Sequence, residues 1–305
     1  MDMELNETQR AIEDSCTRLF ARKAGPSRAR LLRAEGGFDR PLLEEMQSAG
    51  FLDLFDDAET GPLAAALVTE WASTAAALAP IGQRALIAPA AMSDIPPLVV
   101  AVGEKGRKGP VRYAAEADLL ILLDGDDAQA VRKGDFVAEP VDSKFGYPMA
   151  RIASAKGTAL AAGSGRTARN WWRVAIAAEV AGIGRAALDL TIRYLKDRVQ
   201  FDRPIASYQA IQHRLVDCHV STDAVQWAAR EAAYHRAPDE LAASAAIAAE
   251  ETAYRLFYEM HQLTGAIGFT REYDLHLWTM RLQTLRQEAG GINSHAHDLV
   301  HARWG

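Results

Sequence analysis

The sequence predicts a mainly helical protein with a small β domain in its middle. Apolar residues recur at helical spacing through residues 1–97 and again, in longer patterns, through residues 166–305. Between them, residues 98–165 contain short aliphatic runs separated by turn residues, which is typical of strands. Of the 305 residues, 49% are hydrophobic and 24% are charged. The chain can therefore bury enough apolar surface to fold, so disorder is excluded as its main state.

Residues 1–97 are predicted to form a reduced N-terminal helical domain. Asn6 and Gln9 have the spacing of a capping box, in which each side chain binds the backbone N–H of the other residue. Cys16 and Phe20 follow at helical spacing on one apolar face. Further helices are predicted around residues 42–51, 63–78 and 82–92.

Residues 98–165 are predicted to form a reduced middle β domain. Strands are expected at residues 98–102, 119–123, 128–133, 135–141 and 152–160. The acidic turn Asp124–Asp127 lacks the alternating ligands and closing Glu of a calcium loop, so no calcium site is predicted. The segment Gly163–Arg166 lacks the Lys-Ser/Thr of a phosphate-binding P-loop. It is interpreted as a flexible linker into the last domain.

Residues 166–305 are predicted to form a C-terminal helical bundle. Helical patterns cover residues 167–194, 211–225, 241–260, 274–287 and 293–302. Long helices with short links favour an antiparallel arrangement. His297 and His301 share a helical face, but no third ligand stands at the usual spacing, so no metal site is predicted.

Charge and cysteine content exclude several classes of function. The formal net charge is −6, which argues against nucleic acid as a partner because binding it needs dense basic residues. The two cysteines, Cys16 and Cys218, form no disulfide framework and indicate a reducing, cytoplasmic compartment. No run of about 18 apolar residues occurs, and the N-terminus lacks the apolar segment of a secretory signal. A membrane location is therefore not expected.

Two segments of the last domain carry candidate binding residues. Arg198 and Phe201 lie in a turn between helices, with Gln209 at the start of the next helix. An arginine there can pair with a phosphate, and an exposed ring can cover an aromatic ligand. The alternative is a solvated connection whose apolar residues pack locally. Farther on, the glycines around Gly265 can let the backbone approach a ligand closely, or can simply end a helix.

Together, these two segments resemble the motifs of the acyl-CoA dehydrogenase family. The first matches the family's Arg-x-x-Phe, Pro-Ile and aromatic-Gln-x-x-Gln-His pattern at Arg198, Phe201, Pro204, Ile205, Tyr208, Gln209, Gln212 and His213. The second matches Gln-x-x-Gly-Gly-x-Gly-Phe-Thr-x-Glu-Tyr, with Ala266 replacing one glycine, at Gln262, Gly265, Gly268, Phe269, Thr270, Glu272 and Tyr273. The resemblance is strong from about Arg166 onward. It implies the family's fold: an N-terminal helical domain, a middle β domain and a C-terminal four-helix bundle.

The resemblance also implies FAD as the cofactor and α,β-dehydrogenation of an acyl-CoA thioester as the reaction. In the family, the two motifs contact the pyrophosphate and adenosine half of a flavin that is bound mainly to a neighbouring subunit. Carried over, this role falls on Arg198, Phe201, Gln209, Gln262, Gly265 and Ala266. The family's usual electron acceptor is an electron-transfer flavoprotein.

The family's catalytic base, a glutamate, is missing from both of its usual positions. One position falls on Trp172, and the other falls near Gly290. Glu288 is the nearest carboxylate, two positions out of register, and its alternative interpretation is a solvated residue at a helix end. The middle domain also lacks the Thr/Ser-bearing loop that supports the flavin ring in the family. The half of the site that holds the ring is therefore expected to be degraded.

Three hypotheses follow. In the favoured one, the chain is the shortened subunit of an α2β2 acyl-CoA dehydrogenase that acts on a bulky acyl group, such as a steroid side chain. It would then complete the FAD site of its partner. In the second, the chain is a self-sufficient homo-oligomeric dehydrogenase that uses Glu288 or another base. In the third, it is a non-enzymatic helical scaffold that has lost the flavin.

Overall fold

The computed structural model describes residues 5–305, which begin with a group of short helices. These elements are α1 (Glu7–Lys23), α2 (Pro26–Ala34), α3 (Arg40–Ser48), η1 (Leu54–Asp56), α4 (Gly61–Thr74), the π-helical turn η2 (Gln83–Ile87) and α5 (Ala88–Ala91). The expected capping box is confirmed, because Asn6 Oδ1 accepts from Gln9 N at 2.8 Å and Gln9 Oε1 accepts from Asn6 N at 3.1 Å. The sequence prediction missed α2, which begins at Pro26, a residue well suited to the first turn of a helix.

Two small sheets follow the first helices. Their elements are β1 (Val100–Glu104), β2 (Val111–Arg112), η3 (Ala114–Glu116), β3 (Leu119–Asp124), β4 (Asp127–Arg132), β5 (Phe136–Val141), β6 (Met149–Ala155) and β7 (Thr158–Ala159). One sheet has the order β1-β3-β4-β7, with β1 parallel to β3 and the other pairs antiparallel. The second sheet is antiparallel, in the order β2-β6-β5. The strand β2 was not predicted, because two residues are too short for an alternating pattern.

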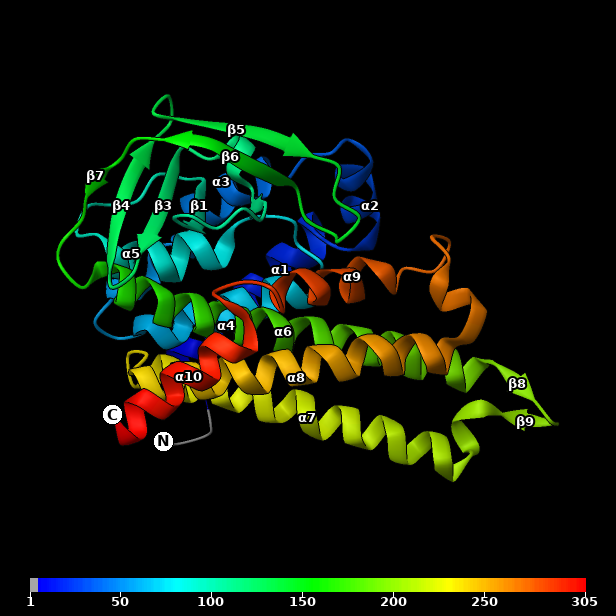
Figure 1. Ribbon diagram of the computed structural model, residues 1–305. Helices are drawn as coiled ribbons and strands as arrows, with labels where there is room; N and C mark the ends of the chain where they lie inside the picture. Colours follow the sequence, from blue (N-terminus) through cyan, green and yellow to red (C-terminus); the bar gives the residue numbers. More distant parts are fainter. Residues whose placement is uncertain (1–4) are drawn as a thin grey trace.

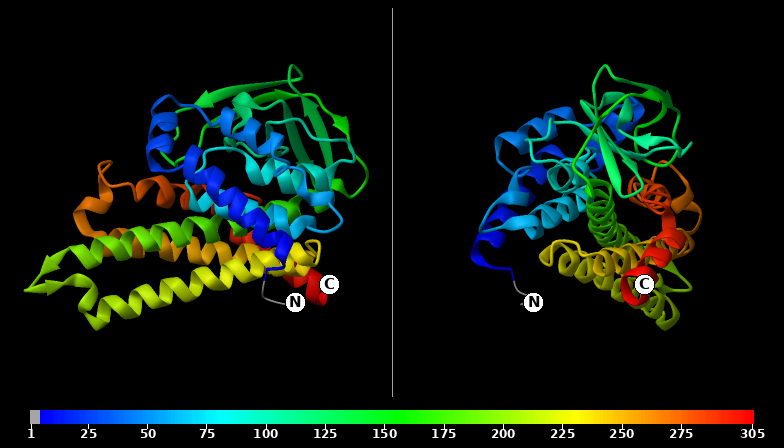
Figure 2. Two further views of the ribbon diagram at one scale, coloured as in Figure 1. Left: turned by 180° about the vertical axis from the view of Figure 1, so that it is seen from behind. Right: turned by 60° about the vertical axis from the view of Figure 1, so that its left-hand side comes forward.

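The C-terminal part is a bundle built around one long helix. Its elements are α6 (Ser164–Asp197), β8 (Val199–Gln200), β9 (Arg203–Pro204), η4 (Ile205–Ser207), α7 (Gln209–Tyr234), α8 (Asp239–Thr264), η5 (Gly265–Phe269), α9 (His276–Leu285) and α10 (Gly291–Trp304). The helix α6 packs against α4, α7, α8 and α9 and so joins the first helices to the bundle. Figure 2 shows the sheets on one side of α6, and α7 and α8 on the other.

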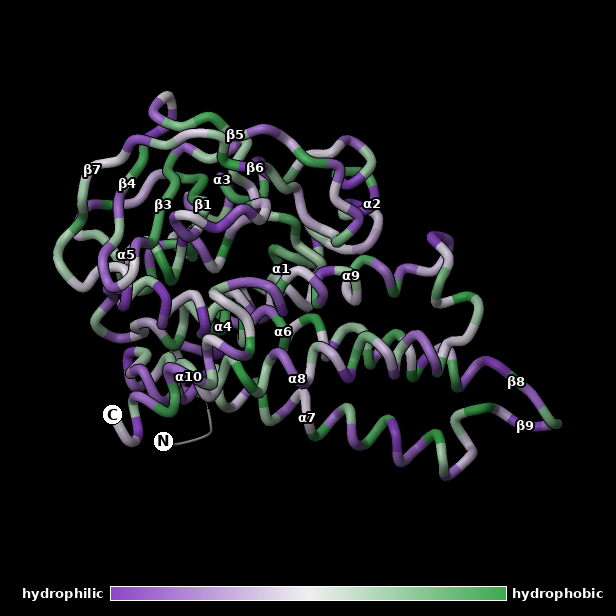
Figure 3. Tube along the Cα trace, viewed as in Figure 1, coloured by the Kyte–Doolittle hydropathy of each residue, from purple (hydrophilic) through white to green (hydrophobic). Residues whose placement is uncertain are grey.

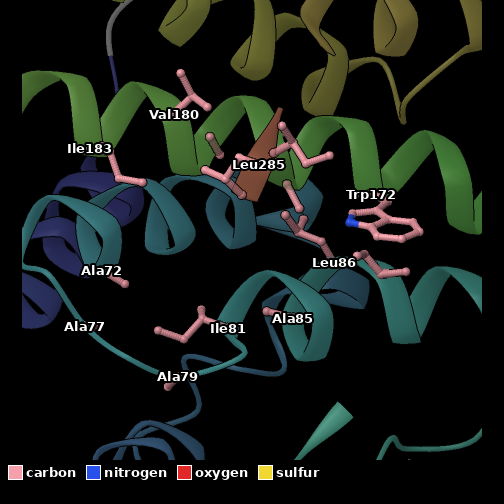
Figure 4. Close-up of a cluster of buried hydrophobic side chains, with 14 of the residues drawn as sticks. Ala72, Ala77, Ala79, Ile81, Ala85, Leu86, Trp172, Val180, Ile183 and Leu285 are labelled. Atoms are coloured by element: carbon pink, nitrogen blue, oxygen red, sulfur yellow. The ribbon is translucent and has the colours of Figure 1, made fainter. Parts of the chain in front are cut away.

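The hydropathy of each element matches its position. In Figure 3, hydrophobic and hydrophilic residues alternate along α7, which has one side toward the bundle, whereas β3 is hydrophobic along its length. A core of alanine, leucine and isoleucine side chains lies where α6 crosses η2, with Trp172 of α6 beside Leu86 (Figure 4). Within residues 5–305, no helix is both long and apolar enough to cross a bilayer.

The predicted fold class is confirmed: the chain is mainly helical, with a small β part and a helical C-terminal bundle. The exact division at residues 97/98 and 165/166 stays a prediction. One local prediction is wrong, because Gly163–Arg166 is not a flexible linker. The helix α6 begins at Ser164, and a Cβ at Gly165 would overlap the carbonyl oxygen of Asp127. Glycine therefore lets this turn of α6 pack directly on the sheet.

Candidate functional site

A buried ionic cluster joins three distant parts of the chain. Arg112 on β2 donates from Nη1 to Glu179 Oε2 of α6 at 2.6 Å. It also donates from Nε and Nη2 to the two oxygens of Glu288, which follows α9, at 2.6 Å each. The exposed fraction of these side chains is 2% for Arg112, 8% for Glu179 and 12% for Glu288. The Arg112 guanidinium thus holds Glu288 in a bidentate ion pair that is largely shielded from water.

Two aromatic side chains complete this cluster. Trp172 donates from Nε1 to Glu288 Oε2 at 3.0 Å, and Tyr147 donates its hydroxyl to Glu179 Oε2 at 2.9 Å. The Arg112 guanidinium also lies over the Tyr147 ring, 4.6 Å from its centroid. We call these five residues, Arg112, Tyr147, Trp172, Glu179 and Glu288, the buried ionic cluster.

The cluster brings together both sequence positions at which a catalytic glutamate is expected. Trp172 occupies the first position, and its indole contacts Glu288, next to the second position at Gly290. The interpretation of Glu288 as a solvated helix-end residue is therefore wrong, because the side chain is buried among charged and aromatic partners. No residue near Glu288 in the sequence indicates this burial, since Arg112 lies 176 residues away.

The cluster contains more negative than positive charge, because one guanidinium forms ion pairs with two carboxylates. Burial raises the pKa of Glu288 above its ordinary value, Arg112 opposes that rise, and the nearby Glu179 adds to it. A raised pKa is typical of a general base, but a base also needs a free oxygen facing its substrate. Both oxygens of Glu288 are occupied by Arg112, so the geometry favours a structural role.

Little space remains beside the cluster. The cavity lined by Tyr147 and Glu179 measures about 10 Å³, which suits about one water molecule. Trp172 and Leu86 fill the neighbouring volume between α6 and η2 (Figure 4). An acyl chain or a flavin ring would have to displace these side chains to approach Glu288.

The first group of predicted cofactor residues lies on the β8–β9 hairpin and at the start of α7. Gln200 pairs with Arg203 across a two-residue turn, in which Phe201 and Asp202 both have positive φ. A hairpin turn of this kind favours Asn and Gly, so a phenylalanine there is strained, and such strain is common at binding sites. Phe201 is 87% exposed, and Arg198 and Gln209 are exposed as well.

The second group lies at the C-terminal end of α8. Gln262, Gly265 and Ala266 are all exposed, and Gly265 ends the helix with a φ of +64°. Figures 1 and 2 place this end of α8 at the same end of the bundle as the hairpin. Gly268 has a different role: a Cβ there would overlap the Thr264 hydroxyl, so packing requires this glycine.

The exposed end of the bundle fits the phosphate half of a dinucleotide, whereas the cluster does not fit its ring. The Arg198 side chain is exposed, and nothing in the described part of the chain lies within 4 Å of a Cβ built at Gly265. An exposed guanidinium and open backbone can both bind phosphate oxygens. At the cluster, by contrast, the side chains bind one another, and the cavity beside Tyr147 and Glu179 measures only about 10 Å³.

A second buried network was not found from the sequence. Arg173 Nε donates to Nδ1 of His295 at 3.1 Å, and His295 Nε2 lies 3.0 Å from Glu250 Oε1. His295 is fully buried, so it ties α10 to α6 and α8. The rings of His297 and His301 lie edge-to-face with their centroids 4.5 Å apart, and the described residues contain no group of three or more metal-type ligands.

Comparison with known proteins connects this geometry with one family. Residues 165–302 match the model of the acyl-CoA dehydrogenase C-terminal domain. The acyl-CoA dehydrogenase IpdE2 of Mycobacterium tuberculosis is 29% identical over 291 residues, which cover 90% of this chain and 91% of that protein.

Solved structures share the fold over nearly the whole chain. In the ChsE4–ChsE5 complex from Mycobacterium tuberculosis, one chain matches with a TM-score of 0.84 and 18% identity, covering 99% of this chain and 98% of that one. A chain from a variant of the steroid ACAD Tcur3481–Tcur3483 matches with a TM-score of 0.82 and 21% identity, covering 97% of this chain and 97% of that one.

Proposed function

We propose that the chain, which matches the acyl-CoA dehydrogenase C-terminal domain over residues 165–302, is a member of that family and acts there as a shortened subunit that completes the FAD site of a partner subunit. In this proposal the chain has no working catalytic base of its own. The observation that carries the proposal is the bidentate ion pair between Arg112 and Glu288, which occupies both oxygens of the carboxylate next to the expected base position at Gly290.

The chemistry of the family reaction explains why this pair matters. The base must take a proton from the carbon next to the thioester carbonyl, so a free carboxylate oxygen has to lie within hydrogen-bond reach of that carbon. Breaking the Arg112–Glu288 pair would leave a buried guanidinium facing only Glu179, at a cost of several kcal/mol. Trp172 supports the same conclusion, because its indole fills the other base position.

The exposed end of the bundle carries the residues that would bind the FAD. Arg198 would hold the pyrophosphate of the FAD, the Phe201 ring would pack on it, and Gln209 would add a polar contact. Gln262, Gly265 and Ala266 would approach the same end of the cofactor with exposed backbone and side-chain groups. FAD supplies the hydride acceptor of the reaction when it is bound, and the partner subunit would hold its ring.

The substrate and partners follow from the same proposal. We infer an acyl-CoA with a bulky acyl group, such as a steroid side chain, an α2β2 assembly and an electron-transfer flavoprotein as acceptor. A steroid ACAD and a two-component complex among the structural neighbours support this inference. The free, buried thiols of Cys16 and Cys218 support a reducing, cytoplasmic compartment.

Substitution of Glu288 by Gln in the co-purified complex tests the missing base. Glutamine keeps the shape of the glutamate side chain and one oxygen that accepts a hydrogen bond from Arg112, but it cannot take up a proton as a base. We expect turnover of acyl-CoA to change by less than about twofold, because the partner supplies the base. Loss of a true general base would lower turnover by about 10²–10⁴-fold. The FAD content of the variant complex, measured alongside, shows whether the site is intact.

One observation favours the self-sufficient alternative, namely that burial raises the pKa of Glu288. In that case Glu288→Gln would abolish turnover while FAD stays bound, and the chain alone would oxidise acyl-CoA. Either result would refute the subunit proposal.

A further inference from the structure

A second cavity opens on the other side of Tyr147, at the junction of the first helices and the sheets. It lies between the end of α2, the segment from Tyr113 to Glu116 and the loop 140–149, and it measures about 180 Å³. Its walls are partly apolar, with Leu78, Val141 and Met149 among them. Ligand pockets commonly measure about 300–1,000 Å³, so this one suits a molecule of only a few heavy atoms.

Arg33 brings a positive charge without a counter-charge to this pocket. Its Nη2 donates to the carbonyl of Lys144 at 2.7 Å, while Nη1 is buried without a partner. Burial lowers the pKa of the Arg33 guanidinium, and the positive charges of Arg271 and Arg281 lower it further. Within residues 5–305, no carboxylate forms an ion pair with Arg33. Such a cation attracts an anion.

The two acidic residues that line the pocket do not supply that anion. Asp142 forms an ion pair with Lys144 at 2.6 Å, and its side chain is 81% exposed. Glu116 is exposed as well. Both therefore lie at the solvent-facing rim rather than beside Arg33.

Tyr113 offers a second polar group at the same pocket. The residue is only 1% exposed, and it lines the pocket. Its ring is held edge-on by Phe38 and Tyr147, with centroid distances of 6.0 and 5.9 Å. The backbone has a φ of +61°, a strained conformation for a bulky residue. The chain thus places a buried phenol at the pocket at an energetic cost.

We propose that this pocket binds a small carboxylate with a short apolar body, whose oxygens meet the Arg33 guanidinium and the Tyr113 hydroxyl. One cation and one neutral donor match a single negative charge shared between two oxygens. The apolar walls match the body of such an acid better than they match inorganic phosphate, whose further oxygens would lose their hydration unpaired.

Binding of butyrate tests this proposal on the full-length chain, purified with any subunit that accompanies it. An NMR titration gives the Kd of butyrate for the unaltered protein and for Arg33→Gln and Tyr113→Phe. We expect each substitution to weaken binding about tenfold or more, since each removes a hydrogen bond to a charged group. Arg30→Gln is the matched control, because Arg30 lies one turn earlier on α2 and pairs with Asp274.

Three results would overturn the proposal: no saturable binding of butyrate, equal weakening by Arg30→Gln, or binding of phosphate as tight as that of butyrate. Tyr113→Phe keeps the ring and its packing. The Kd of butyrate for this variant therefore tests the proposal even if Arg33→Gln prevents folding. Far-UV circular dichroism of each variant confirms that the fold is kept.

Discussion

Replacing Arg112 by Leu removes the guanidinium that binds both Glu179 and Glu288, and its effect can be worked out from the cluster. The substitution leaves Glu179 and Glu288 buried without a counter-charge. Breaking a buried pair in this way costs about 3–5 kcal/mol of unfolding free energy. The carboxyls limit the cost by taking up protons. For a carboxyl with an ordinary pKa of about 4.3, that uptake costs about 3.7 kcal/mol at pH 7 but only about 1 kcal/mol at pH 5.

The sign of the pH dependence follows from this protonation. A buried carboxyl without Arg112 has a folded-state pKa above its unfolded value, so it binds protons more strongly in the folded protein. Its contribution to stability is then full below the unfolded pKa and is lost as the pH rises through the folded pKa. We therefore expect the deficit of Arg112→Leu to shrink by about 2–3 kcal/mol in total between pH 7 and pH 5.

Urea unfolding at pH 5, 6 and 7 measures this deficit directly. Arg112→Lys is the matched control: it keeps the charge but loses the fork, so we expect a smaller deficit that changes less with pH. The double variant Arg112→Leu/Glu288→Gln removes one uncompensated carboxyl and should weaken the pH dependence. A deficit of equal size at pH 5 and pH 7 would refute the reasoning, because it would show that lost packing, not stranded charge, causes the instability.

Three further predictions test the packing, the thiols and the cofactor end. Gly182→Ala places a Cβ against the carbonyl of Glu70 where α6 crosses α4, so we expect a loss of about 1–3 kcal/mol in urea unfolding. Gly109→Ala should change little, because its Cβ would meet only the Arg107 side chain, at 3.9 Å. Burial raises the pKa of the Cys16 thiol to about 12, so iodoacetamide at pH 8 should leave it unmodified until denaturant is added; modification in native buffer would contradict the buried position. Arg198→Ala should lower FAD affinity of the co-purified complex about tenfold without changing its unfolding midpoint, and an unchanged flavin content would remove Arg198 from the site.

Much of the fold could be predicted because its signals are local. The helix α6 carries an apolar pattern over most of its length, and the capping box at Asn6 depends on residues three apart. The strand β3 is a single run of aliphatic residues with a turn after it. Each of these features is determined within one element, so the sequence shows it directly.

The candidate site could be predicted only in part, because its buried half depends on distant pairs. Arg112 lies on a two-residue strand, and its partners lie 67 and 176 residues away. Nothing around Glu288 in the sequence shows that its charge is buried rather than solvated. The exposed half of the candidate site could be predicted more easily, because Arg198 and Gln262 belong to recognisable motifs. Their roles at the cofactor stay predictions.

The flavin content of the chain alone and of the co-purified complex tests the central claim most directly. The chain and the product of an adjacent gene are expressed separately and together, and absorbance near the flavin bands is measured with the mass of each species. The account predicts FAD only in the mixed complex, at a mass that fits two copies of each subunit. A yellow protein from this chain alone, with stoichiometric FAD and acyl-CoA oxidation, would contradict it.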